Sequence, residues 1–136
     1  MKKLTILLLC GLFWLTASAV TLAAPVSETL KSGGDLRNYW LVRPEGLEKT
    51  KPAPLLMVLH GSAGSGEDMM TVTQRGFERL ADKEKFVVVY PDALERRWND
   101  QGGTVDDVGF LLAIVDKLVA DGLVDKNRIY VAGISN

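Results

Sequence analysis

Two short, unbroken apolar runs constrain the fold of this 136-residue chain most strongly. Residues 55–59 read LLMVL and lie between Pro54 and Gly61, and residues 86–90 read FVVVY and end at Pro91. A strand without polar alternation is typical of a parallel sheet that is covered on both faces. We therefore expect two neighbouring buried strands.

Helical spacing follows each of these strands. The first pattern predicts one helix that ends near Lys83 and Lys85, and the second predicts a helix that ends at Gly122, with Thr104 as N-cap and Asp107 in its first turn. The first stripe comprises Met70, Thr73, Phe77, Leu80 and Ala81. The second comprises Val108, Leu111, Leu112, Val115, Leu118 and Val119.

Two further segments complete the predicted domain. Residues 128–132 (RIYVA) predict a third strand, and residues 37–43 (RNYWLVR) alternate as a half-buried strand does, after a turn at residues 32–35 (SGGD). The alternation of strands and helices predicts right-handed crossovers and a mainly parallel sheet with flanking helices. The fold class is therefore α/β.

Residues 1–24 have the pattern of a secretory signal peptide. A basic Met1-Lys2-Lys3 start precedes an apolar run over residues 4–15, and cleavage is expected after Ala19 or Ala23. The run is short for a membrane span, although an uncleaved anchor is an alternative. Cys10 lies too early for a lipoprotein signal and is the only cysteine. We expect export to the periplasm or beyond the cell, and a domain over residues 25–136.

The charge balance excludes one class of partner. The net charge is -1, with no run of five like charges, so the basic surface that binds nucleic acid is missing. The sequence suggests no metal and no cofactor.

Two motifs could carry chemistry. Residues 133–136 (GISN) are the first four positions of G-x-S-x-G, which places a serine on a tight turn after a strand. Residues 60–64 (HGSAG) form a glycine-rich loop whose backbone N–H groups could bind an oxyanion. A phosphate loop would need Gly-Lys-Ser/Thr, and a dinucleotide site would need an acidic residue where only Asp92, after Pro91, comes near.

Over residues 37–136 these pieces together resemble an α/β-hydrolase, more narrowly the secreted polyhydroxybutyrate depolymerase and feruloyl esterase-like serine esterases. The matching stretches are RNYWLVRP, LHG, VVVYPD, WND, VDDVGFL and RIYVAGISN. The resemblance implies a hydrolase of small or polymeric esters. Its site residues would be Ser135 as nucleophile, the N–H groups of Ser62 and Asn136 as oxyanion hole, His60 and Gly61 as loop support, and Trp98 near the substrate mouth.

The rest of a catalytic triad is missing from these residues. In such enzymes an Asp or Glu and then a His follow the serine, but only Asn136 follows Ser135, and His60 is the only histidine. Asp106 and Asp107 fit helix-capping partners better than catalytic acids. We expect an N-terminal portion of a serine esterase, inactive by itself and unstable because of a bare sheet edge.

Other functions stay open at this point. A dienelactone hydrolase or a prolyl-peptidase-like enzyme would share the same serine turn. A non-catalytic exported binding protein could keep the fold without the reaction, and a short exported protein of this length is a third alternative.

Overall fold

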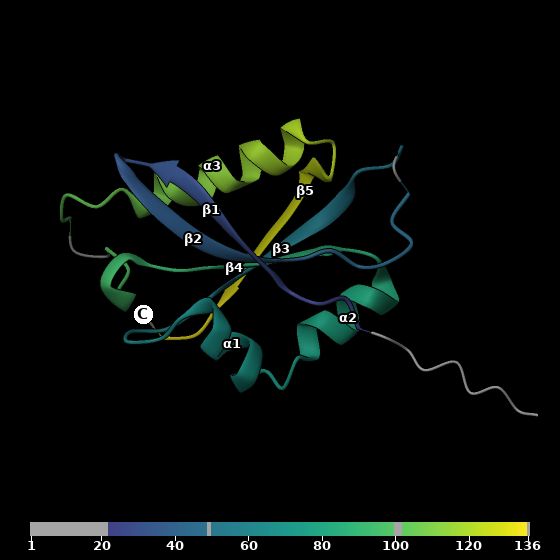
Figure 1. Ribbon diagram of the computed structural model, residues 1–136, viewed down its shortest axis with the longest axis horizontal. Helices are drawn as coiled ribbons and strands as arrows, with labels where there is room; N and C mark the ends of the chain where they lie inside the picture. The colour runs from purple at the N-terminus through teal and green to yellow at the C-terminus, as the bar shows by residue number, and fades with distance from the viewer. Residues whose placement is uncertain (1–21, 49, 100–101, 136) are drawn as a thin grey trace, which may run out of the picture.

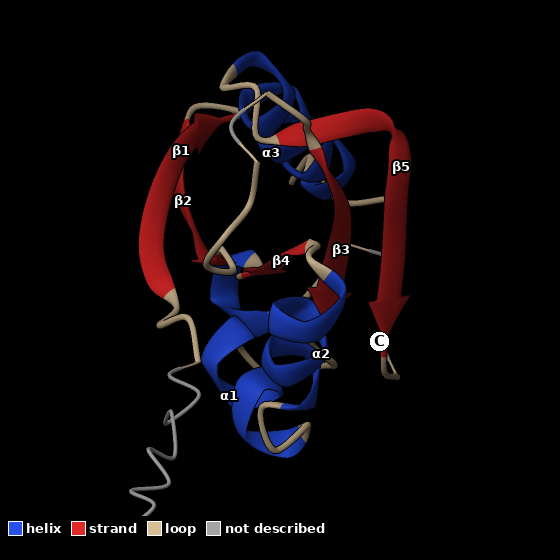
Figure 2. Ribbon diagram, turned by 90° about the vertical axis from the view of Figure 1, so that its right-hand side faces the viewer, coloured by secondary structure: helices blue, strands red, loops and turns tan. Residues whose placement is uncertain are grey.

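The structure is a computed structural model that describes residues 22–48, 50–99 and 102–135. Within them, a mixed sheet lies between α3 on one side and α1 and α2 on the other (Figures 1 and 2). Its strands are β1 (Val26–Ser32), β2 (Asp35–Val42), β3 (Ala53–Leu59), β4 (Val87–Pro91) and β5 (Val124–Gly133). The helices are α1 (Gly66–Val72), α2 (Gly76–Glu84) and α3 (Asp107–Ala120), with a 3-10 turn η1 (Leu94–Arg96).

The strand order is β1-β2-β4-β3-β5. β3 is parallel to both β4 and β5, which confirms the predicted parallel arrangement of these three strands. β2 is antiparallel to β4, and β1 pairs with β2 as a hairpin that turns at Gly33 and Gly34, both with positive φ. The sequence predicted this turn but not β1, whose residues are largely polar.

The central strands are covered on both faces, as their unbroken apolar runs predicted. Phe110, Ile114 and Leu118 of α3 belong to one core, and Met69, Met70 and Ala81 of α1 and α2 belong to the other. Because side chains alternate along a strand, each central strand contributes to both cores. The first core takes Leu55, Met57, Val87 and Val89, and the second takes Val58, Val88 and Tyr90.

The single helix predicted after β3 is wrong, because the chain breaks between α1 and α2. Gln74 and Arg75 have φ values of 51° and 55°, in the left-handed region, and the Thr73 hydroxyl donates to the Met69 carbonyl (2.7 Å). Because of the break, the residues of α2 do not continue the helical periodicity of α1, and a different set of them faces the sheet. Leu80 is therefore 45% exposed, whereas Glu78 is fully buried.

The predicted start and buried stripe of α3 also need correction. Asp106, rather than Thr104, is the N-cap, and its side chain accepts from the Gly109 N–H (2.7 Å). Val108 and Leu112 were expected in the core but are more than half exposed. Most positions of this helix are apolar, so the periodicity does not select one face.

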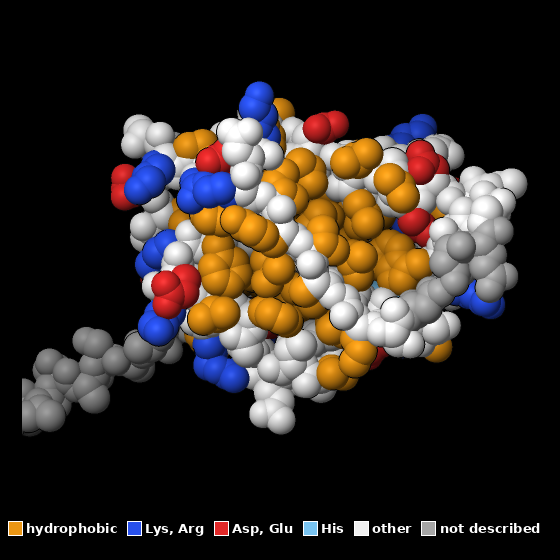
Figure 3. Space-filling model, turned by 180° about the vertical axis from the view of Figure 1, so that it is seen from behind, with side chains coloured by type: hydrophobic (Ala, Val, Ile, Leu, Met, Phe, Trp, Pro, Cys, Tyr) orange, Lys and Arg blue, Asp and Glu red, His pale blue; other side chains and the backbone are white. Residues whose placement is uncertain are grey.

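β5 forms one edge of the sheet and is poorly covered. It begins at Val124, before the predicted start, with a register shift where it pairs with the beginning of β3. Tyr130, Val131 and Ile134 are each more than half exposed. From the side of the molecule where β5 lies, apolar side chains cover a broad area (Figure 3).

Two regions stay outside this description. The predicted signal segment up to residue 21 and the predicted oxyanion donor Asn136 both lie outside the described residues. None of the helices that the structure does describe is long and apolar enough to cross a membrane.

Candidate active site

The parallel strands bring three loops to one end of the sheet, where β3, β4 and β5 have their carboxyl ends. Leu59 at the end of β3 is paired with Gly133 at the end of β5, and Met57 is paired with Val89 of β4. The chain leaves β3 toward β4 on one side and leaves β4 toward β5 on the other. Connections that leave neighbouring strands on opposite sides mark the switch point at which open α/β sheets place ligands, and here that point lies between β3 and β4, next to the loop after β3.

Ser135 lies two residues beyond the last residue of β5, at this end of the sheet. Its φ is 58°, a left-handed conformation that is uncommon for a residue with a side chain. The residue is exposed. Strained positions of this kind gather at functional sites, which makes Ser135 a candidate nucleophile on geometric grounds.

In the loop after β3, one backbone N–H group takes part in none of the hydrogen bonds between described residues. Neighbouring N–H groups donate as follows: Ala63 to the Arg96 carbonyl (2.9 Å), Gly64 to the Gly61 carbonyl (3.0 Å) and Gly66 to the Asp92 carboxylate (2.6 Å). No hydrogen bond found between described residues uses the N–H of Ser62. Ser62 is an exposed residue, so its N–H is a candidate donor to an external acceptor.

His60 is buried, and both of its ring nitrogens are occupied. Its Nε2 lies 3.1 Å from the N–H of Ala93, and its Nδ1 lies 2.7 Å from the Gly61 carbonyl oxygen. Because the Ala93 N–H can only donate, Nε2 accepts and Nδ1 carries the proton. His60 is therefore held as an Nδ1–H tautomer inside the structure, with no free nitrogen for a serine proton.

Trp98 lies against His60. Its indole Nε1 donates to the His60 carbonyl (2.7 Å), and the two rings are 4.9 Å apart. Trp98 also lines an open hollow of about 570 Å³ with Leu94, Arg97 and Val105. The side chain thus contacts the glycine-rich loop on one side and borders a hollow in the segment after β4.

Two buried features of this region were missed by sequence reasoning. Gly66 packs so closely that an added Cβ would lie 2.6 Å from the Tyr90 carbonyl oxygen. The Arg37 guanidinium donates to Asp107 (2.6 Å) and lies over the Phe110 ring (4.1 Å), with both ionic side chains buried. The two partners are 70 residues apart, so no local pattern joins them. The only early signal was an arginine at the first position of an otherwise strand-like run.

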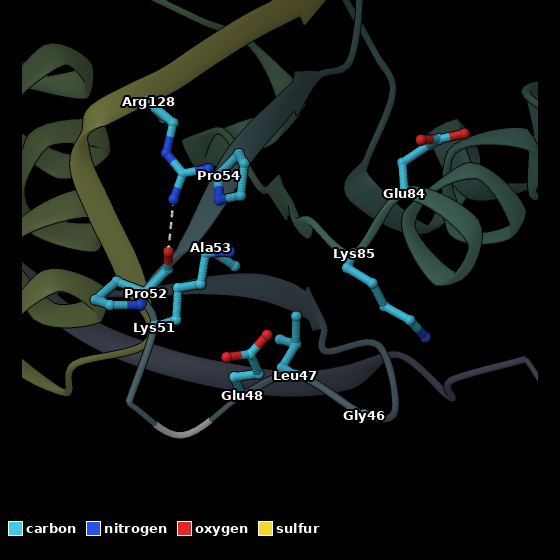
Figure 4. Close-up of a pocket in the computed structure, with 10 residues that line it drawn as sticks. All are labelled: Gly46, Leu47, Glu48, Lys51, Pro52, Ala53, Pro54, Glu84, Lys85 and Arg128. Atoms are coloured by element: carbon cyan, nitrogen blue, oxygen red, sulfur yellow. Dashed lines mark hydrogen bonds between the residues drawn. The ribbon is translucent and has the colours of Figure 1, made fainter.

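A second hollow lies at the opposite end of β3 and β5 (Figure 4). It measures about 210 Å³. Arg128 donates to the Pro52 carbonyl and Lys85 donates to the Glu45 carbonyl, each at 2.7 Å. These cations hold the backbone of the loop before β3, and the hollow is remote from Ser135.

Among the residues that the structure describes, no group of His, Cys, Asp and Glu side chains could hold a metal ion.

Comparison with known proteins finds similar hydrolases. The bifunctional acetylxylan esterase/xylanase XynS20E of Neocallimastix patriciarum is 34% identical over 112 residues, or 81% of this chain and 16% of that protein. Poly(3-hydroxyalkanoate) depolymerase C of Paucimonas lemoignei is 28% identical over 130 residues, or 88% of this chain and 30% of that protein. The chain thus spans less than a third of either relative. No protein-family model matches it.

A solved structure shares the fold. The S-formylglutathione hydrolase FrmB from Staphylococcus aureus matches with a TM-score of 0.63 at 22% identity, over 83% of this chain and 48% of that one. The layered sheet of this chain agrees with that likeness, and the two sequence relatives are an esterase and a polyester depolymerase. This chain has the α/β-hydrolase fold, and its sequence is similar to those of esterases.

Proposed function

We propose that this chain carries the nucleophile and one oxyanion donor of an exported serine ester hydrolase. The observation that supports the proposal is the pairing of Leu59 with Gly133, because the loop that contains Ser62 and the left-handed turn at Ser135 start from adjacent points at the same end of the sheet. Acyl transfer needs a nucleophile and an oxyanion donor close to each other.

The reaction would proceed in two steps. The Ser135 Oγ attacks the ester carbonyl carbon, its proton passes to a base, and the carbonyl oxygen becomes an oxyanion bound by the N–H of Ser62, with Asn136 as the second donor by family resemblance. Collapse of this intermediate releases the alcohol and leaves an acyl-serine. Water then attacks the acyl-serine to release the acid and restore Ser135.

His60 is not the base in this proposal. Its Nε2 accepts from the N–H of Ala93, and its Nδ1–H is bonded to the Gly61 carbonyl. The base and the acid that orients it therefore come from outside the described residues. We accordingly expect no turnover of ester by these 136 residues alone.

The substrate class rests on the relatives. One relative is named for acetylxylan and another for poly(3-hydroxyalkanoate), both of which carry esters on or within polymers. We propose acetyl or feruloyl esters on plant polysaccharide, or hydroxyalkanoate polyesters, as the substrates. Trp98 would contact them, because it contacts the glycine-rich loop and borders an open hollow.

Chemical rescue tests the proposed roles. Imidazole supplied in solution can replace a missing base, so hydrolysis of p-nitrophenyl acetate should rise with imidazole in the unmodified chain more than in Ser135→Ala. Ser62→Pro removes the donor N–H and should lower the Ser135-dependent rate about 100-fold, whereas Ser62→Ala keeps the N–H and the rate. Equal rates for the unmodified chain and Ser135→Ala at every imidazole concentration would rule the proposal out.

A further inference from the structure

The glycine-rich loop is held from one side by residues 92–99, the segment that follows β4. The N–H of Ala93 donates to the His60 ring, and the Trp98 indole donates to the His60 carbonyl. Ala63 and Arg96 add a second connection, since the Ala63 N–H donates to the Arg96 carbonyl (2.9 Å) and the Arg96 Nε donates to the Ala63 carbonyl (2.7 Å). The residues on both sides of Ser62 are thus fixed by this segment.

One buried ion pair fixes both ends of that segment. The Arg37 Nη2 donates to the carbonyl of Asp92 (3.3 Å), where the segment begins, and to Asp107 Oδ1 (2.6 Å). The second carboxylate oxygen of Asp107 accepts the N–H of Asn99 (2.6 Å), where the segment ends. Charge-assisted bonds of this length constrain geometry strongly.

The ion pair is itself rigidly seated. Arg37 is 2% exposed in β2 and lies over the Phe110 ring, and Asp107 begins α3. A buried ion pair adds little net stability compared with apolar side chains of similar volume. Its placement is better explained by the geometry that it imposes on residues 92–99 than by stability.

We propose that Asp107 is a positioning residue for the Ser62 N–H. Together with Arg37 it fixes residues 92–99, which hold the His60 ring and carbonyl and so set the direction of the N–H two residues later. The proposal rests on the proposed function for the use of that N–H. The support itself is a separate property of the folded chain.

Amide hydrogen exchange and nitrogen NMR of the full chain test the proposal. Asp107→Asn offers only one acceptor oxygen in place of two, so it should speed exchange over residues 60–64 about tenfold, and exchange in β3 and β4 also rises because one charge of the buried ion pair is lost. His60 is the only histidine, so its ring nitrogens are assigned without ambiguity. If the Ala93 N–H no longer donates to the His60 ring, a second population of His60 should appear in the spectra, with its proton on Nε2.

A milder variant covers the case in which Asp107→Asn does not fold. Trp98→Phe keeps an aromatic ring but removes the bond to the His60 carbonyl, and it should also speed exchange at residues 60–64. Trp40→Phe is the matched control, because no bond between described residues uses the Trp40 indole, and it should leave these amides unchanged.

Two results would overturn the positioning role. One is unchanged exchange and an unchanged His60 tautomer in both test variants. The other is an equal rise in exchange in the loop and in β3 and β4 in Trp98→Phe, which keeps the ion pair, because an equal rise indicates a general loss of stability. These readouts do not depend on catalysis. A failure of imidazole rescue would therefore refute the proposed function, but it would not decide whether Asp107 positions the loop.

Discussion

Leu59 and Gly133 are directly paired across β3 and β5, each as the last residue of its strand. A Cβ added at Gly133 would lie 3.4 Å from both the Cβ and the carbonyl oxygen of Leu59, so the two chains run side by side up to the sheet edge. The glycine-rich loop and the Ser135 turn consequently start from adjacent points. This relationship underlies the proposed assignment of both to one site.

Substitution of Gly66 should destabilise the fold because of a close contact. An added methyl group would lie 2.6 Å from the Tyr90 carbonyl oxygen and 2.9 Å from its Cβ. Gly66→Ala should lower the free energy of unfolding by about 1–3 kcal/mol in urea titration. In the control Gly76→Ala, the nearest atom is 4.0 Å away, and stability should be unchanged or rise by up to about 1 kcal/mol. Equal effects of the two substitutions would refute the close packing of Gly66.

Removal of one partner of the buried ion pair should be costly. Arg37→Met leaves the Asp107 carboxylate buried without its cation, and we expect a loss of about 3–5 kcal/mol in the free energy of unfolding. The double variant Arg37→Met/Asp107→Leu removes both charges and should recover part of that loss. Chemical denaturation of the four proteins in this cycle measures the coupling. Additive losses would mean that the two side chains do not interact.

Alkaline pH should weaken the fold through two buried tyrosines. Burial raises the pKa of Tyr39 and Tyr90 above the usual value, and for Tyr90 the bond to the Glu78 carboxylate raises it further. Above about pH 10 the unfolded chain releases phenol protons that the folded protein retains, so unfolding becomes easier as pH rises. The contribution of Tyr90 should approach about 1.4 kcal/mol per pH unit once the unfolded phenol is ionised, and that of Tyr39 has the same sign; this stability is fully present well below pH 10.

Single substitutions separate these contributions. Tyr39→Phe should make the free energy of unfolding fall less steeply with pH in the alkaline range, by the contribution of one tyrosine. Tyr130→Phe should leave this slope unchanged, because Tyr130 is exposed. Urea titrations between about pH 8 and 11 measure the slope. An unchanged slope in Tyr39→Phe would contradict the burial of that phenol.

The free edge of β5 should cause self-association. Residues 129–134 (IYVAGI) carry no charge, whereas the other edge strand, β1, contains Glu28 and Lys31. Val131→Lys should raise the concentration at which the chain associates in analytical ultracentrifugation, because a charge on an edge strand opposes pairing. Val108→Lys changes an equally exposed valine on α3 and should have a smaller effect. Equal effects would point to general hydrophobic contact instead of edge pairing.

The contacts of Ala23 favour the earlier of the two predicted cleavage sites. Ala23 is 8% exposed in the core beneath α2, and its N–H donates to the Asp82 carboxylate (3.2 Å). Cleavage after Ala19 keeps this contact, and cleavage after Ala23 removes it. If the predicted signal peptide is cleaved, N-terminal sequencing of the mature protein should therefore find Val20 first. A start at Ala24 would contradict this prediction.

The sequence predicted the elements that local chemistry determines. The runs at residues 55–59 and 86–90 identified buried strands because both of their faces are covered. β1 was missed because a polar edge strand has no apolar signal. Glu78 and Arg37 were not expected in the core, because charged side chains are rarely buried without a partner. Asp107, the partner of Arg37, lies far away in the sequence, so no local pattern indicated the pair.

The same limit applies to the site. Ser135 and Ser62 were proposed from short motifs, which describe neighbours along the chain. The support of the loop comes from bonds of Ala93 and Trp98 to His60, across 33 and 38 residues. Only the folded sheet brings these side chains together. The sequence therefore suggested the candidate reactive groups, and the structure added what holds them.

Peptide mapping by mass spectrometry tests the central claim most directly. The chain is incubated with p-nitrophenyl acetate and imidazole, then digested, and acetylated residues are located. Because imidazole can serve as the base in both steps, the reaction is stopped with acid within the first turnover, when we predict an acetyl group on Ser135 that Ser62→Pro reduces about 100-fold relative to Ser62→Ala. Acetylation of lysines or other serines with none on Ser135 would contradict the assignment of Ser135 as the nucleophile.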